Sequence, residues 1–202
     1  MMILVTGGAR SGKSSFAEKY AASFGDHGVY IATSQIYDEE MKDRIELHKT
    51  RREQTEFFWE TIEEPYDLDQ WFEISHKRDH KKLVLVDCLT LWLSNWLLTF
   101  ENQLKEKYSG MMAKEAVESK LELQQKVIGK IETLVTSLKL FNGTIILVTN
   151  EVGDGIVPEY PLGRLYRDLA GVMNQKIAEI CDQVFLVTVG IPIELKSKQF
   201  LY

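Results

Sequence analysis

Short apolar runs alternate along the chain with longer stretches in which apolar residues recur every three or four positions. The short runs predict strands and the longer stretches predict amphipathic helices. Strands are expected over residues 2–6, 29–33, 83–87, 144–149 and 184–189, and helices over 13–24, 38–52, 90–104, 112–140 and 162–182. Because these strands are apolar throughout, the pattern predicts an α/β fold with a mostly parallel sheet and helices on both faces.

Two further segments refine this outline. Residues 55–64 are expected to add a short edge strand. The charged stretch 101–120 is expected to be a surface helix–loop–helix, and the helix over 112–140 is long enough to project and to serve contacts between subunits. No repeat or linker interrupts the pattern, so residues 1–202 are interpreted as a single nucleotide-binding catalytic domain.

The most informative motif lies directly after the first predicted strand. Residues 7–14 have the G-x-x-x-x-G-K-S pattern of a phosphate-binding loop, between a strand and a helix as the motif requires. Backbone N–H groups and the helix N-terminus would bind phosphate, Lys13 would reach the outer phosphates, and Ser14 would ligate magnesium. The predicted loop consists of Gly7, Gly8, Ala9, Arg10, Ser11, Gly12, Lys13 and Ser14.

Composition narrows the function classes. A hydrophobic content of 45% and a charged content of 27% are ordinary for a soluble globular protein. The net charge of −6 argues against a broad surface for binding nucleic acid or an anionic membrane. Cys88 and Cys181 lie beside apolar residues and are expected to be buried, inert thiols. The chain enters a strand without a basic leader, and its most apolar helix is too short to span a membrane. We therefore expect a cytoplasmic enzyme.

Polar residues follow two other predicted strands. Asp87 ends an apolar strand, where a carboxylate can hold magnesium or its water, although many strands end in an aspartate that caps the next helix. Thr33 and Ser34 end the second strand, and ligands of open α/β sheets bind beyond such ends. Their hydroxyls fit a ligand contact and turn formation equally well.

One histidine lies between arginines at helical spacing. His48 shares a stripe with Met41, Ile45 and Arg52. Arg44 precedes His48 by one turn, and arginines one turn away on each side are suited to binding phosphates. A histidine on an apolar stripe is usually a satisfied core residue, and the spacing leaves both interpretations open. The remaining histidines are expected to be solvated: His27, His76 and His80.

The C-terminal third combines a glycine-containing loop with an arginine-bearing helix. Residues 148–158 leave a strand and enter this loop, and the helix after it carries Gly171, whose position invites close approach by a ligand or another subunit, unless that face is merely solvated. The buried arc of the helix is predicted as Leu165, Leu169, Val172 and Met173, and the opposite face as Arg164, Arg167, Asp168, Gly171 and Gln175.

Taken together, these segments resemble the bifunctional adenosylcobinamide kinase / adenosylcobinamide-phosphate guanylyltransferase family of cobalamin biosynthesis. The resemblance spans nearly the whole chain. It is carried by residues 3–14, 30–34, the Arg44-Ile45 and His48 segment, 87–90, 148–158, Arg167-Asp168, Gly171, Asn174-Gln175 and 190–192.

The resemblance implies a RecA-like P-loop NTPase sheet, a homo-oligomer (a trimer in the family's pattern) and two reactions on the aminopropanol arm of a corrinoid. GTP, or ATP for the first step, would phosphorylate the hydroxyl with Mg²⁺, and His48 would then carry GMP from GTP to the new phosphate. The nucleotide site would comprise residues 7–14, Ala32, Thr33, Ser34, Lys49, Thr50, Arg51, Arg52, Glu63 and Asp87. Relatives often have Arg-Pro-x-x-Trp after the histidine; here Glu53 follows Arg52 and Trp59 comes later, so Glu63 rests on a presumed insertion.

Two other functions fit parts of the sequence. A P-loop small-molecule kinase without guanylyl transfer would leave His48 structural. A nucleotide-switched binding module would read out a partner, although the chain lacks the Asn-Lys-x-Asp motif that reads guanine in many GTPases.

Overall fold

One seven-stranded sheet runs through the molecule. The computed structural model describes residues 1–35, 52, 56–76, 82–108 and 113–200. The strands lie in the order β3-β2-β4-β5-β1-β6-β7, and all pair in parallel except β7, which is antiparallel to β6. They are β1 (Met2–Thr6), β2 (His27–Ala32), β3 (Phe58–Glu63), β4 (Leu83–Asp87), β5 (Thr144–Val148), β6 (Gln183–Thr188) and β7 (Ile191–Glu194).

The two faces of the sheet are covered differently. The helix α1 (Lys13–Ala21) packs on one face, against alternate strand residues such as Ile3, Leu85 and Ile146. The opposite face carries the larger core, to which the neighbouring residues Leu4, Val84 and others contribute. Side chains alternate between faces along a strand, so both cores are built from the same apolar runs.

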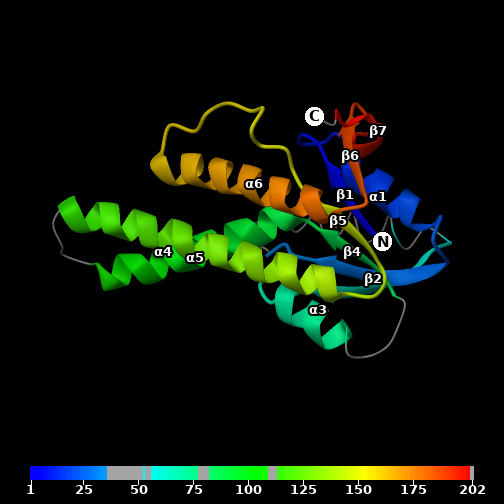
Figure 1. Cartoon of the computed structure of the whole chain (residues 1–202), viewed down its shortest axis with the longest axis horizontal. Coiled ribbons are helices and arrows are strands. Elements are labelled where there is room, and N and C mark those ends of the chain that lie inside the picture. The colour runs from blue at the N-terminus through cyan, green and yellow to red at the C-terminus, as the bar shows by residue number, and fades with distance from the viewer. Residues whose placement is uncertain (36–51, 53–55, 77–81, 109–112, 201–202) are drawn as a thin grey trace.

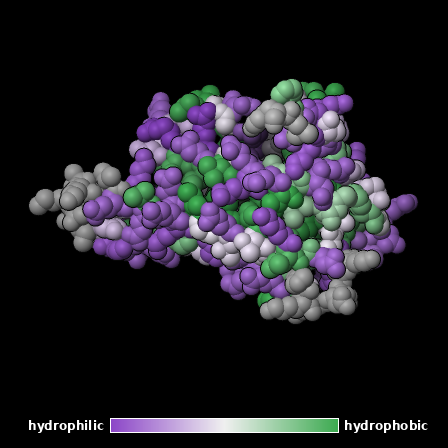
Figure 2. Space-filling model, viewed as in Figure 1, coloured by the Kyte–Doolittle hydropathy of each residue, from purple (hydrophilic) through white to green (hydrophobic). Residues whose placement is uncertain are grey.

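Four helices cover that larger core: α3 (Leu68–His76), α4 (Leu89–Lys107), α5 (Ala113–Leu140) and α6 (Pro161–Ile180). Figure 1 shows α4, α5 and α6 side by side, with one end of the α4–α5 pair extending beyond the sheet. The outer surface of these helices is mostly hydrophilic, and the hydrophobic side chains visible in Figure 2 gather in the seams between them. The expected helical excursion at residues 101–120 is confirmed as the end of α4 and the start of α5.

Most of the predicted elements are confirmed, with bounds that differ by a few residues. The expected edge strand over 55–64 is β3, at the edge of the sheet. The first helix ends at Ala21 rather than residue 24 because Ser23 and Phe24 bond back to the Tyr20 and Ala21 carbonyls and form a turn. Three elements were not predicted from the hydrophobic pattern: α3, β7 and the short 3₁₀ helix Lys196–Lys198. The predicted helix over 38–52 lies outside the described residues, except for Arg52.

Among the predictions for single residues, those for two cysteines and one histidine are confirmed and one for a valine was wrong. Cys88 and Cys181 are both buried and free, as expected, and burial raises their pKa to about 11 and about 12, respectively. His27 is exposed beside Asp26, also as expected. The assignment of Val172 to the buried arc of α6 was wrong: it is 37% exposed, whereas its neighbour Met173 is fully buried.

None of the described helices has the length and hydropathy that crossing a membrane requires. The side chain of His76 and all of His80 lie outside the described residues.

Candidate nucleotide-binding site

The carboxyl ends of the parallel strands meet at one edge of the sheet. There Ala32 pairs with Glu63 on one side and with Asp87 on the other. Asp87 pairs in turn with Val148, which is the neighbour of Val5 in β1. Ligands of open α/β sheets bind beyond this edge, so the sheet brings the predicted residues of three strands beside the loop that follows β1.

The phosphate-binding loop turns sharply between β1 and α1. Gly7, Arg10 and Gly12 have positive φ angles of 155°, 56° and 94°. A Cβ atom at Gly7 would lie 2.4 Å from the Val187 carbonyl oxygen, so glycine is needed there for space as well as for conformation. The N-cap of α1 is Gly12, with neither a side-chain cap nor an acidic residue in the first turn. The helix therefore presents its first N–H groups and positive dipole end to an anion.

The turn of the β6–β7 hairpin contacts this loop. Its two-residue turn has φ angles of 49° at Val189 and 82° at Gly190, the signature of a type I′ turn. The Gly190 N–H donates to the Ser11 carbonyl at 2.8 Å, and a Cβ at Gly12 would lie 3.3 Å from the Gly190 Cα. The C-terminal hairpin thus fixes the shape of the N-terminal loop.

Lys13 lies within the loop rather than projecting into solvent. Its side chain is 9% exposed, and its Nζ donates to the Gly8 carbonyl at 3.0 Å. The charge is thus held over the loop in which phosphate would bind, which agrees with the predicted role of this residue.

Asp87 points toward the face of the sheet that α1 covers. Leu83 and Leu85 pack on that face, and Asp87 continues the alternation two residues later. Its Oδ2 accepts a hydrogen bond from Tyr30 Oη at 3.0 Å. The Asp87 carboxylate and the Ser14 hydroxyl are oxygen donors of the type that Mg²⁺ takes from proteins, where a few such ligands are completed by water and substrate phosphates. Among the residues described, no group of three or more His, Cys, Asp or Glu side chains forms a denser metal cage.

Thr33 has a structural role. Its hydroxyl is fully buried, donates to the Cys88 carbonyl at 2.6 Å and accepts from the Cys88 N–H at 2.8 Å. These bonds link the ends of β2 and β4, a role that differs from the turn formation expected as the alternative to a ligand contact. Ser34 is half-buried next to it, at the strand ends.

Arg52 and Glu63 are placed differently. Arg52 is 6% exposed, pairs with Glu18 of α1 at 3.6 Å and stacks on the Tyr30 ring with 3.7 Å between Cζ and the ring centroid. Its charge is therefore held between α1 and β2. Glu63 is exposed at the end of β3, beside Ala32. The other members of the predicted histidine segment lie outside the described residues: Met41, Arg44, Ile45, His48, Lys49, Thr50 and Arg51.

Tyr30 is the main residue at this edge for which no role was predicted from its own position in the sequence. It is 4% exposed, and burial together with the Asp87 carboxylate raises its pKa well above the ordinary value. A tyrosine inside an aliphatic strand run is the signal that could have found it, because a buried phenol requires a hydrogen-bond partner.

The segment after β5 closes the other side of the site. Glu151 N–H donates to the Gly7 carbonyl at 3.0 Å, which ties this segment to the phosphate-binding loop. The Asn150 side chain donates to Thr90 Oγ1 at 2.7 Å, and Thr149 donates to Asn174 at 2.7 Å. The segment is therefore connected to α4 and α6 as well as to the loop.

Arginines of α6 hold the remainder of that segment. Arg167 donates to the Gly153 carbonyl, and Arg164 donates to the Pro158 carbonyl at 3.0 Å. The predicted polar face of α6 thus binds its own preceding loop. A Cβ atom at Gly171 would meet nothing within 4 Å, so no close contact within the described chain accounts for this glycine.

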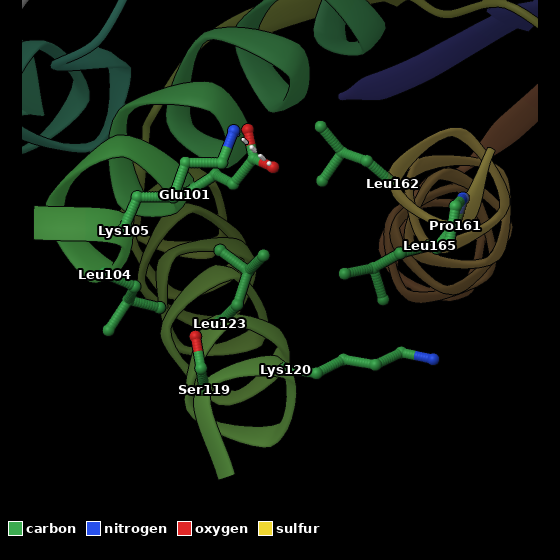
Figure 3. A pocket seen from close by; sticks show the side chains of 9 residues that line it. All are labelled: Glu101, Leu104, Lys105, Ser119, Lys120, Leu123, Pro161, Leu162 and Leu165. Carbon is green, nitrogen blue, oxygen red and sulfur yellow. Dashed lines mark ion pairs between the residues drawn. The ribbon is translucent and has the colours of Figure 1, made fainter. Parts of the chain in front are cut away.

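A separate hollow of about 240 Å³ lies between the α4–α5 pair and the start of α6 (Figure 3). Leu123 of α5 and Leu162 and Leu165 of α6 point into it, and the Lys105–Glu101 ion pair of α4, at 2.9 Å, lies at its side. Its lining is mainly aliphatic, unlike a phosphate site. The residues that line it are Glu101, Leu104, Lys105, Ser119, Lys120, Leu123, Pro161, Leu162 and Leu165.

Solved structures support the fold. The chain superposes with a TM-score of 0.51 and 10% sequence identity on a structure described as a prototypical ATPase from the type III secretion system of pathogenic bacteria. The match covers 99% of this chain and 58% of that ATPase. This likeness, with the parallel sheet and the phosphate-binding loop, confirms the predicted P-loop NTPase fold.

Sequence identity to curated proteins is higher, and the alignments cover nearly the full length of this chain and of each relative. The chain is 40% identical over 199 residues to the bifunctional adenosylcobalamin biosynthesis protein CobU of Escherichia coli (strain K12), covering 97% of this chain and 100% of that protein. It is 39% identical to the bifunctional adenosylcobalamin biosynthesis protein CobP of Pseudomonas aeruginosa, covering 98% and 99%. A family model described as cobinamide kinase / cobinamide phosphate guanyltransferase matches residues 3–195, and the chain therefore belongs to this family.

Proposed function

We propose that this protein phosphorylates the aminopropanol hydroxyl of adenosylcobinamide and then transfers GMP from GTP to the new phosphate, giving adenosylcobinamide-GDP. The observation that carries the proposal is the phosphate-binding loop, with Asp87 two strands away at the same sheet edge, in a chain whose family match spans residues 3–195. The proposed setting is the cytoplasm, and the proposed assembly is a homotrimer.

In the kinase step the protein binds and orients the nucleotide. The N–H groups at the start of α1 and the Lys13 ammonium bind the phosphates, and Ser14 and Asp87 would hold magnesium. Magnesium bound there would neutralise charge that develops on the transferred phosphoryl group. The attacking oxygen belongs to the corrinoid arm, so this step requires no protein nucleophile.

In the guanylyltransferase step His48 is the proposed nucleophile. An imidazole nitrogen attacks the α-phosphate of GTP, a phosphorus–nitrogen bond forms, and the bond to the leaving pyrophosphate breaks. An oxygen of the corrinoid phosphate then attacks the GMP group and releases His48. One loop serves two positions of attack, so the nucleotide or the histidine segment must change position between the steps.

Labelled GTP tests this proposal directly. Incubation with GTP labelled at the α-phosphate should label the protein, whereas label at the γ-phosphate should not be retained. The adduct should be lost in acid and survive alkali, because protonating the bonded imidazole makes it a good leaving group. His48→Ala should abolish labelling and GMP transfer while sparing the kinase step. An acid-labile GMP adduct on the His48→Ala protein would assign the nucleophile to another residue.

One substitution in the phosphate-binding loop tests the shared site, and two assay outcomes would support the alternative functions. Lys13→Ala should impair both reactions, since the ammonium binds phosphate whichever phosphorus is attacked. Phosphoryl transfer without any protein-bound GMP would instead support a kinase without guanylyl transfer. Nucleotide-dependent partner binding without group transfer would support a switch module.

A further inference from the structure

A buried chain of side chains connects α1 to Asp87 beneath the sheet edge. Glu18 on α1 pairs with Arg52 at 3.6 Å, and Arg52 stacks on Tyr30 with 3.7 Å between Cζ and the ring centroid. Tyr30 Oη then donates to Asp87 Oδ2 at 3.0 Å. The Glu18 and Arg52 side chains are 10% and 6% exposed, and Tyr30 is 4% exposed. We call these four residues the Glu18–Asp87 network.

The position of Tyr30 follows from the strand register. Tyr30 pairs with Leu85 in β4, and Asp87 lies two residues further along that strand, on the same face. Diagonal neighbours in a sheet are within reach of a long aromatic side chain. The phenol of β2 can therefore hydrogen-bond the carboxylate of β4 without any loop between them.

The Tyr30 ring is itself held on two sides. Arg52 lies over its face, and Trp59 of β3 makes an edge contact with 5.8 Å between ring centroids. Arg52 is oriented in turn by Glu18, which lies one helical turn after Ser14 on α1. The network therefore begins near one proposed magnesium ligand and ends on the other.

A magnesium ligand is effective only when its oxygen is already correctly oriented. Mg²⁺ demands near-ideal octahedral geometry, and hydrogen bonds to ligating carboxylates fix their orientation. The Tyr30 bond occupies Oδ2 of Asp87 and thereby restricts rotation of the carboxylate.

We propose that Tyr30 is a positioning residue that orients Asp87 for magnesium, and that Arg52 and Glu18 hold Tyr30 in place. The inference rests on the proposed role of Asp87 as a magnesium ligand. In this proposal Arg52, whose charge is paired with Glu18, holds Tyr30 in place and does not contact the nucleotide directly.

Tyr30→Phe removes the hydroxyl and keeps the ring that Arg52 and Trp59 contact. The measurement is equilibrium binding of a fluorescent GTP analogue, with and without chelator, as a function of Mg²⁺ concentration. We expect the Mg²⁺ concentration at half-saturation to rise about tenfold, the size that losing a hydrogen bond to a charged group predicts. Nucleotide affinity in chelator should stay within error of the wild type, and the melting temperature should fall by only a few degrees, because one buried hydrogen bond is lost.

Tyr20→Phe is the matched control. Tyr20 lies on α1, and its hydroxyl donates to Gln183 at 2.9 Å, so the same atom is removed without touching Asp87. This variant should keep the wild-type Mg²⁺ dependence. Glu18→Gln, which neutralises the charge that orients Arg52, should raise the half-saturating concentration in the same direction as Tyr30→Phe.

Asp87→Asn distinguishes a failure of the proposed magnesium role of Asp87 from a failure of the positioning role of Tyr30. If Asp87→Asn leaves the Mg²⁺ dependence unchanged, the proposed magnesium role of Asp87 fails. If Asp87→Asn removes that dependence while Tyr30→Phe binds Mg²⁺ like the wild type, the positioning role of Tyr30 fails and the proposed site stands. An equal effect of Tyr20→Phe would also overturn the positioning role.

Discussion

Replacing Gly7 by alanine tests how closely the phosphate-binding loop is fitted to the sheet. The new Cβ would lie 2.4 Å from the Val187 carbonyl oxygen and 2.7 Å from Ser11 Oγ. Ser11 can change rotamer, but Val187 belongs to a strand that is paired on both sides, by β1 and by β7. The loop itself must therefore move.

The expected loss of stability has two parts. A non-glycine residue at a strained positive φ costs about 1–3 kcal/mol, and overpacking a rigid site typically costs about 1–3 kcal/mol. Restriction of the unfolded chain by alanine returns roughly 0.4–1 kcal/mol. Gly7→Ala should therefore destabilise the protein by about 2–5 kcal/mol, which at this chain length lowers the melting temperature by about 5–20 °C.

Urea unfolding followed by tryptophan fluorescence measures this loss, and nucleotide binding reports the displaced loop. Gly8→Ala is the control in the same loop, because a Cβ at Gly8 meets nothing within 4 Å. It should change stability by no more than about 0.5 kcal/mol. A Gly7→Ala protein as stable as the wild type, or a Gly8→Ala protein equally destabilised, would refute the reasoning.

Three further predictions concern other parts of the fold. Val189→Asn should stabilise the protein by roughly 1 kcal/mol and so raise its melting temperature, because asparagine tolerates the left-handed φ of 49° and the resulting Asn-Gly pair suits a type I′ turn. A lower melting temperature would contradict this. The pKa of Glu194 is lowered to about 2, first by the backbone N–H of Ser197, so its contribution is present above its ordinary pKa and lost as pH falls toward 2. The stability difference between wild type and Glu194→Gln should therefore shrink with falling pH in chemical unfolding, and a constant difference would argue against this bond. Burial raises the pKa of Cys88 and Cys181, so a thiol reagent at pH 8 should modify them slowly in the native protein and fully in urea; rapid native modification would show that the thiols are accessible.

Local patterns were sufficient for the elements that carry the phosphate site. The first four residues of β1 and of β4 are all apolar, and the glycine-lysine motif follows β1 directly, so strand, loop and helix could all be predicted from neighbouring residues. By contrast β7 is a four-residue edge strand with a proline and exposed isoleucines, which has no alternating pattern. Its turn also places a valine where asparagine or glycine is usual.

Contacts between distant residues account for most of what was missed at the site. The role of Tyr30 depends on the β2–β4 register, which brings residues 30 and 87 together. The link from Gly190 to Ser11 joins opposite ends of the chain. Val172 was misplaced because its position on the helix predicts burial, whereas the neighbouring elements leave that side of α6 uncovered.

The strand order has a consequence for synthesis of the protein on the ribosome. β1 is made well before both of its neighbours in the sheet, β5 and β6, which begin at residues 144 and 183. At about 5–20 residues per second, β1 remains without its second neighbour for roughly 10–35 s. During that time an apolar strand with two unpaired edges is open to mispairing. The phosphate-binding loop is also incomplete until Val187 and Gly190 have been made, so a nascent chain should acquire nucleotide affinity only after residue 190 has left the ribosome.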